Sequence, residues 1–152
     1  MTVEEIAMRL LATLVIVLPL TVRAAETPQD KKSLYDRLGG AKGIAKVVDD
    51  LIDIVAKDPK IRPVHKKHFM EGDIAGLKKK LRDQIGEATG GPEKYKGKDM
   101  KTAHQGMGIT DADFDALVGC LTRALDKNGV RAADRDELLK MLAPLRKEVV
   151  EK

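Results

Sequence analysis

Apolar side chains recur every three or four residues along four separate stretches of this chain. In the first stretch the apolar positions lie on one face of an α-helix; they are Ile44, Val47, Val48, Leu51, Ile52 and Val55. Residues 74–85, 114–125 and 138–149 repeat the pattern with mainly aliphatic side chains. A half-buried strand needs strict alternation of apolar and polar residues, and no stretch shows that pattern clearly. The sequence therefore predicts an all-α fold.

Residues that start or stop helices mark the ends of these stretches. Pro59 cannot continue the hydrogen-bond ladder of the first helix, so that helix is expected to end before it. Asp73 and Thr110 are good N-cap residues for the second and third helices, and Thr110 opens a TDAD pattern that resembles a capping box. The fourth helix is expected over about residues 133–150, with a kink at Pro144.

Composition limits what fills the core between these helices. Of the 152 residues, 43% are hydrophobic but only 3% are aromatic, and tryptophan is absent. The core is therefore built mainly from aliphatic side chains, or partly from a group that the chain does not encode. The single cysteine, Cys120, excludes an intramolecular disulfide and any metal-binding or haem-attachment motif that needs a cysteine pair.

Charge excludes one class of partner. The chain has 28 Lys and Arg residues against 24 Asp and Glu residues, and the two signs are interspersed. Nucleic-acid-binding domains carry a clustered basic stripe with aromatic side chains, which this sequence lacks. We therefore expect no nucleic-acid partner, and we interpret most of the charge as a solvated surface.

The N-terminus has the features of a targeting segment. The apolar run LLATLVIVLPLTV, residues 10–22, is too short to span a bilayer comfortably and is typical of the core of a signal peptide. Val22 and Ala24 have the small-residue spacing that signal peptidases prefer, so cleavage is expected after Ala24. Glu4 and Glu5 are unusual before such a core.

This interpretation divides the chain into three parts. Residues 1–24 are expected to be a signal peptide, 25–32 a polar linker, and 33–152 a single helical domain that is periplasmic or secreted. Met8 is an alternative start that would remove the acidic residues. If cleavage fails, residues 10–22 would anchor the domain to a membrane, which is the only membrane association expected.

A long connection separates the second and third helices. Residues 89–110 contain five glycines and only one short helical piece, near residues 98–104. A connection of this length inside a compact domain is usually functional or disordered. His104, one of only three histidines in the chain, lies at its far end.

The three histidines suggest two kinds of metal chemistry. His65 and His68 have i, i+3 spacing, but no third ligand is evident, so we expect both to face solvent in a basic segment. A lone histidine at a helix end is most often a hydrogen-bonding partner of the helix. In an apolar pocket, however, one imidazole is enough to bind a haem, because the porphyrin already supplies four nitrogens. His104 fits either role.

Several segments together resemble a group 1 truncated haemoglobin over roughly residues 33–150. In chain order they are LYDRLGG (34–40), VVDD (47–50), Phe69, ATGGPEKYKGKDMKTAHQGMGIT (88–110) and DFDALV (113–118). The resemblance implies a two-over-two helical sandwich, an abridged globin in which a loop replaces the helix before the proximal histidine. It also implies haem b as cofactor.

The resemblance assigns roles to individual residues. It implies that His104 is the proximal iron ligand and that its other ring nitrogen donates a hydrogen bond to a backbone carbonyl. Phe69 matches a phenylalanine that packs on the haem face, and Tyr95 matches a tyrosine of the loop. The remaining matches line the pocket; they are Met100, Ile109, Phe114 and Leu117.

The distal side departs from the family pattern. Where characterised members carry a Phe-Tyr pair whose hydroxyl binds the ligand, this chain has Leu51 and Ile52. Where they often carry a glutamine, it has Leu81, with Leu77 one turn earlier. A donor in a dry site contributes about 1–3 kcal/mol to O2 binding. The sequence therefore predicts an apolar distal pocket with weaker O2 binding or rapid autoxidation.

Two devices could compensate for the missing donor. Lys80 aligns with a basic position that usually pairs with a haem propionate, but as a neutral amine it could become a sixth iron ligand. His65 or His68 could instead swing in toward the iron. The segment PKIRPVHKKHF, residues 59–69, is a few residues longer than the family norm, so the resemblance predicts the geometry of this segment least well.

Three functions remain open at this point. The first is reversible binding of O2, NO or CO, with NO dioxygenase or nitrite reductase chemistry as a side activity. The second is a six-coordinate haem protein, with Lys80 or a histidine as distal ligand, that serves electron transfer or NO and nitrite chemistry with a redox partner. The third is a haem-free helical interaction module. In each case we expect a monomer or weak dimer.

Overall fold

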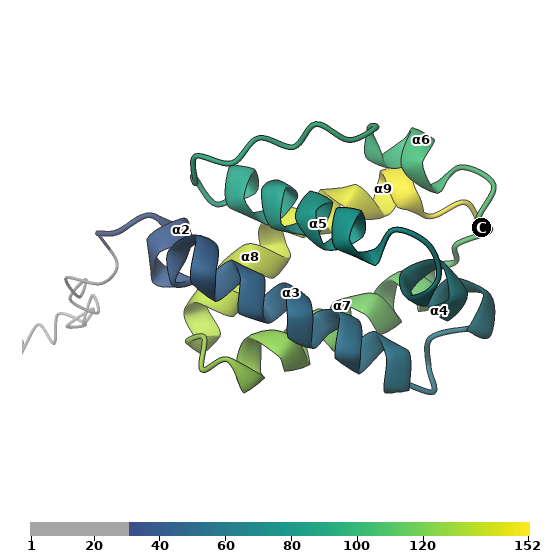
Figure 1. Cartoon of the computed structure of the whole chain (residues 1–152), viewed down its shortest axis with the longest axis horizontal. Coiled ribbons are helices and arrows are strands. Elements are labelled where there is room, and N and C mark those ends of the chain that lie inside the picture. The colour runs from purple at the N-terminus through teal and green to yellow at the C-terminus, as the bar shows by residue number, and fades with distance from the viewer. Residues whose placement is uncertain (1–30) are drawn as a thin grey trace, which may run out of the picture.

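The structure, a computed structural model, describes residues 31–152. Its elements in chain order are α2 (Leu34–Arg37), α3 (Gly40–Lys57), α4 (Pro63–Met70), α5 (Ile74–Ala88), α6 (Met100–His104), α7 (Asp111–Lys127), α8 (Ala132–Leu142), the 3-10 turn η1 (Ala143–Leu145) and α9 (Arg146–Val149) (Figure 1). The all-α prediction is therefore confirmed for these residues, none of which is in a strand. The expected signal peptide, residues 1–24, lies outside the described residues. Over 31–152, no helix has the length and apolar character needed to cross a membrane.

Helix α3 is the centre of the fold. It packs against α5 within one layer and against α7 of the other layer, which α8 and α9 complete (Figure 1). Its buried side chains are the six predicted from the periodicity, Ile44, Val47, Val48, Leu51, Ile52 and Val55. From α7 and α8, the fully or almost fully buried Cys120, Ala124, Leu125 and Leu138 pack into the same core. The predicted two-over-two sandwich is thus confirmed.

The predicted helix ends are also confirmed where a cap marks them. The Asp73 carboxylate accepts a hydrogen bond from the backbone N–H of Gly76 at 2.8 Å, which starts α5. Thr110 and Asp113 form the complete capping box of α7. Helix α3 ends at Lys57, with Asp58 as its C-cap residue.

Proline accounts for two differences from the sequence expectation. Helix α4 was not predicted, because its sequence PVHKKHFM has no apolar period; Pro63 at its first position presets the helical backbone. In the last segment, Pro144 produces a break where a kink in one helix was expected. Helix α8 stops at Leu142, and the chain passes through a 3-10 turn before α9.

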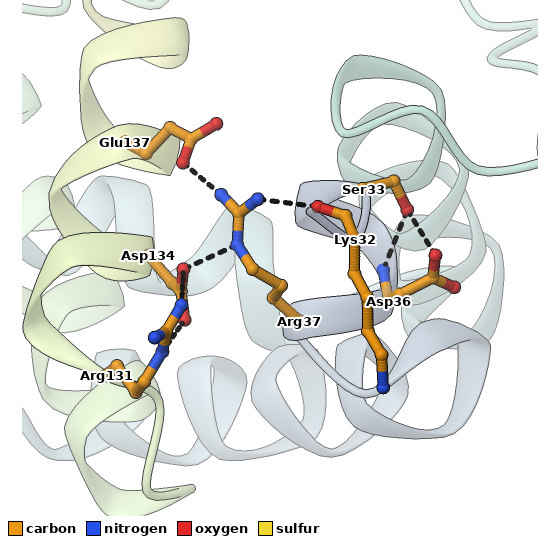
Figure 2. A network of polar contacts seen from close by, with 7 residues as sticks. All are labelled: Lys32, Ser33, Asp36, Arg37, Arg131, Asp134 and Glu137. Atoms are coloured by element: carbon orange, nitrogen blue, oxygen red, sulfur yellow. Dashed lines mark hydrogen bonds and ion pairs between the residues drawn. The ribbon is translucent and has the colours of Figure 1, made fainter. Parts of the chain in front are cut away.

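An ionic network centred on a buried carboxylate joins α2 to α8. Asp134 of α8 is only 2% exposed and accepts hydrogen bonds from Arg37 Nε of α2 at 2.7 Å and from Arg131 Nε at 2.7 Å (Figure 2). Arg37 also pairs with Glu137 and donates to the backbone carbonyl of Lys32. Arg131 and then Arg37 hold the pKa of the Asp134 carboxyl below its usual value. The network fixes α2 on α8.

Removing the buried carboxylate should destabilise the domain. We predict that Asp134→Ala lowers the free energy of unfolding by about 3 kcal/mol, because it leaves the guanidinium of Arg37, whose side chain is 9% exposed, without its buried partner. Asp136→Ala, two residues further along α8 and exposed, is the matched control and should change the free energy of unfolding by less than about 0.5 kcal/mol. Chemical denaturation measures both.

The pH dependence has a definite sign. Because the folded-state pKa of Asp134 is lowered, its contribution is present above the unfolded-state pKa and is lost as the pH falls through the folded-state pKa. The difference in stability between wild type and Asp134→Ala should therefore shrink in acid. A difference that stays constant down to the acid transition would contradict this account of the network.

Candidate functional site

A cavity of about 460 Å³ lies inside the helical sandwich. Its walls come mainly from α4, α5, α6 with the loops on either side of it, and α7, with smaller contributions from α3 and from the segment α8 to α9. All but one of the side chains predicted to surround the cofactor line it; these are Phe69, Leu77, Lys80, Leu81, Tyr95, Met100, Ile109, Phe114 and Leu117. The exception is Ile52, which is buried on α3 but does not line the cavity, whereas its neighbour Leu51 does.

His104 is the last residue of α6 and lines this cavity. Its Nδ1 lies 2.7 Å from the backbone carbonyl oxygen of Met100. A carbonyl can only accept a hydrogen bond, so Nδ1 carries the proton in the neutral imidazole. The lone pair is then on Nε2, which makes Nε2 the metal-ligating atom of this ring. The backbone hydrogen bond expected for a proximal ligand is therefore present.

Short-range contacts position α6 after the long loop. The Asp99 carboxylate accepts from the backbone N–H of Thr102 at 2.9 Å, and this bond holds the pKa of Asp99 below its usual value. Upstream, the Tyr95 hydroxyl donates to the carbonyl oxygen of Lys98 at 2.8 Å. Burial raises the pKa of Tyr95, so the phenol stays protonated as a donor. Tyr95 thus stabilises the turn that enters α6.

The C-terminal segment holds the loop that follows His104. Gly106 and Gly108 have positive φ values of 81° and 62°, a backbone conformation that glycine adopts without steric cost. Their backbone N–H groups donate to Glu151 Oε1 and Oε2 at 2.6 and 2.5 Å, and these two bonds hold the pKa of Glu151 below its usual value. The backbone N–H of Glu151 also donates to the backbone carbonyl oxygen of Ile109 at 2.8 Å.

Helix α5 presents a mostly hydrocarbon wall to the cavity. Leu77 and Leu81 line it, while Lys80 is exposed at its edge. The sequence analysis missed Gln84, whose side-chain amide donates to Met100 Sδ at 3.2 Å and so ties α5 to α6. Its spacing of three residues from Leu81 and seven from Leu77 places it on the same helical face and could have revealed it.

His65 lies in a place that the sequence did not indicate. The expectation that it faces solvent is wrong, because α4 turns it inward to an exposed fraction of 7%. Its Nε2 lies 2.7 Å from Arg62 Nη2 and 3.5 Å from Asp113 Oδ2. His68 is exposed, as expected, but it also lines the cavity and meets Phe69 edge-on.

Arg62 joins α4 to the start of α7. Its Nε and Nη2 donate to the two oxygens of Asp113 at 2.7 and 2.6 Å, which is a bidentate ion pair. Arg62, and then the N–H of Thr110, hold the pKa of Asp113 far below its usual range. Because Asp113 also closes the capping box of α7, one carboxylate fixes both the helix start and the position of α4.

The cavity fits a haem better than a metal ion bound by side chains alone. Over residues 31–152, no cluster of three or more His, Cys, Asp and Glu side chains could hold a metal ion. A haem needs only one protein nitrogen, and His104 offers one with its Nε2 lone pair. Hydrocarbon walls suit the macrocycle, and the exposed cation of Lys80 at the edge suits a propionate.

Comparison with known proteins gives a consistent result. The family model for bacterial-like globins matches residues 33–151. The group 1 truncated haemoglobin GlbN of Mycolicibacterium paratuberculosis is 35% identical over 77% of this chain and 83% of the relative. A group 1 truncated haemoglobin of Tetrahymena pyriformis is 31% identical over 80% of this chain and 97% of the relative.

Solved structures agree with these matches. The Fe(III) form of the Tetrahymena pyriformis truncated haemoglobin has a TM-score of 0.72 and 30% identity, and the match covers 80% of this chain and all of that one. A Synechococcus 2/2 haemoglobin with covalently attached haem has a TM-score of 0.70 and 28% identity, with the same coverage.

The contact of Glu151 with the loop is open to a direct test. In Glu151→Ala the hydrogen-exchange protection factors of the Gly106 and Gly108 amides should fall about tenfold, because two charge-assisted hydrogen bonds are removed. Glu148→Ala, in the same segment and also exposed, should leave both amides unchanged.

Lowering the pH should reduce the protection of these two amides in the wild-type protein, as Glu151→Ala does at neutral pH. The lowered folded-state pKa of Glu151 means that this stabilisation is present above the unfolded-state pKa and is lost as the pH falls through the folded-state pKa. Protection of the two amides should fall over that window in wild type only. Equal loss in Glu151→Ala would show that another group holds the loop.

Proposed function

The chain belongs to the bacterial-like globin family and groups with the truncated haemoglobins of group 1, and we propose that it binds O2 or another diatomic ligand reversibly at a haem held by His104. Haem is the cofactor of this family, and its iron supplies the open coordination position at which O2, NO or CO binds. The observation that carries the proposal is the hydrogen bond from His104 Nδ1 to Met100, which leaves Nε2 free as the axial ligand.

The character of the bound ligand's surroundings follows from α5. Leu77 and Leu81, with Leu51 of α3, contribute hydrocarbon to the cavity wall, and we assign this wall to the distal side. None of the three can donate a hydrogen bond to a bound ligand. Bound O2 carries partial negative charge and depends on such a donor, whereas CO does so much less. Weak O2 binding and ready oxidation to the ferric state are the expected properties.

Three polar side chains that line the cavity already have hydrogen-bonding partners in the protein. Gln84 donates its amide to Met100 Sδ, and the Nε2 of His65 is next to the guanidinium of Arg62. Tyr95 donates to Lys98. These partners support a hydrocarbon distal pocket, because each polar group would have to break an existing contact to reach the ligand.

A six-coordinate haem is the second candidate. Two cavity-lining residues support it, Lys80 and His68, since the side chain of neither has a hydrogen bond or an ion pair with any of residues 31–152. Either could become a distal ligand, Lys80 only as a neutral amine, which requires its desolvation. Such a protein would serve electron transfer or NO and nitrite chemistry.

Optical spectra of the ferric, ferrous and CO-bound protein distinguish these candidates. His104→Ala should lose haem, or retain it without an axial imidazole, while His68→Ala should keep the wild-type spectrum if the distal position is open. The second candidate predicts a low-spin ferrous spectrum that Lys80→Ala or His68→Ala converts to five-coordinate. A normal axial-imidazole spectrum in His104→Ala would show that the proximal assignment is wrong.

A gain-of-function variant tests the hydrocarbon distal wall. Leu81→Gln places an amide donor on the α5 face and should slow O2 dissociation by about 5- to 150-fold, equivalent to about 1–3 kcal/mol. Leu81→Met has nearly the same shape without the donor and should leave the rate within about threefold. Stopped-flow measurements give both rates. Equal rates in the two variants would place Leu81 away from the bound ligand.

A further inference from the structure

Lysines are concentrated at the exposed part of the cavity lining and next to it. The exposed lining side chains of the cavity are His68 on α4, Lys80 on α5 and Lys98 in the loop before α6. Lys96 precedes Lys98 in the same loop and Lys101 follows on α6, and both are exposed. We call Lys80, Lys96, Lys98 and Lys101 the rim lysines. They come from α5, from the loop leading into α6 and from α6 itself (Figure 1).

This charge is not spread over the molecule. Residues 60–105 carry twelve Lys or Arg side chains and six Asp or Glu side chains, whereas the other described residues carry fourteen of each. The excess positive charge of the described domain therefore belongs to the segment that contains α4, α5 and α6. Even if two propionates of a bound haem pair with Lys80 and Lys98, an excess remains on this side.

Several cations outside the rim are held in ion pairs with acidic side chains. Elsewhere Arg123 pairs with Asp58, Lys127 with Asp50, and Arg146 with Asp111 and Asp115. Within residues 31–152, none of the four rim-lysine side chains has an ion pair or hydrogen bond, and the same holds for the side chains of Lys42 on α3 and Lys140 on α8. The positive electrostatic potential of exposed lysines is not reduced by a neighbouring carboxylate when they are unpaired. This potential steers an oppositely charged molecule toward the surface that bears them.

We propose that the rim lysines form the docking surface for an acidic protein that donates one electron at a time, through an iron–sulfur cluster or a flavin. This rests on the proposed function, since the acceptor is the haem in the cavity. A hydrocarbon distal wall that favours oxidation creates the need for a donor, and the rim lysines lie at the exposed part of the cavity lining or next to it. In each encounter one electron leaves the donor's reduced centre and converts ferric to ferrous iron, with no bond formed or broken.

The test uses the full-length haem-loaded protein and an acidic plant-type [2Fe–2S] ferredoxin as probe. Stopped-flow absorbance gives the rate of ferric haem reduction, and calorimetry with oxidised ferredoxin gives the dissociation constant without any reaction. The double variant Lys96→Glu/Lys101→Glu reverses two rim charges that do not line the cavity. Lys42→Glu/Lys140→Glu makes the same change in net charge on exposed positions of α3 and α8.

We expect the rim variant to reduce at least about tenfold more slowly and to bind at least about tenfold more weakly at low salt, with a change below about twofold in the control variant. The difference should disappear as salt rises from about 0.02 M to about 0.5 M, because the interaction is screened. Equal losses in both variants, or no loss in either, would overturn the proposal.

Two further readouts exclude other anionic partners. If reduction by dithionite slows as much as reduction by ferredoxin, the rim attracts small anions and not a protein. If the rim variant loses flotation with anionic phospholipid vesicles while its ferredoxin affinity is unchanged, the surface binds lipid. Either result overturns the docking proposal. Absence of a haem spectrum would contradict the proposed function instead, and the calorimetric affinity would still report on docking.

Discussion

The hydrogen bond between His104 Nδ1 and the carbonyl of Met100 is the interaction on which the site depends. It fixes both the ring and the tautomer, so that Nε2 is available for iron. Side chains from distant parts of the chain converge on the short helix that makes it. Asp99 caps α6, Gln84 of α5 reaches Met100, and Glu151 holds the loop that follows. A five-residue helix would not be stable alone, and these contacts explain why it forms.

The scarcity of aromatic side chains is consistent with a core that includes a cofactor. A cavity of about 460 Å³ in a domain this small removes packing contacts that the helices would otherwise make. A bound haem would restore them, because cavity-lining side chains such as Phe69 and Leu81 would pack on it. Haem binding should therefore stabilise the fold by mass action, while the ionic network around Asp134, which does not line the cavity, holds α2 on α8.

Periodic segments could be predicted from the sequence, and isolated contacts could not. Helices α3, α5 and α7 follow from apolar spacing and caps, and most pocket residues follow from the family resemblance. Helix α4 could not be predicted, because His65 is its only buried residue and is held by Arg62 at the start of α4 and by Asp113 on α7. Glu151 acts across more than forty residues, at a distance no local pattern records. Ile52 was misplaced because the resemblance gives a position in the chain, whereas rotation of α3 decides which side chain reaches the cavity.

Resonance Raman spectroscopy of the unliganded ferrous protein tests the central claim most directly. An iron–imidazole stretching band is observed when the ferrous haem is five-coordinate with a histidine ligand. The structure predicts that this band is present in wild type, because His104 lines the cavity and its bond to Met100 leaves the lone pair on Nε2, and absent in His104→Ala. A wild-type spectrum without the band, or one that keeps it in His104→Ala, would contradict the assignment of His104 and the pocket built around it.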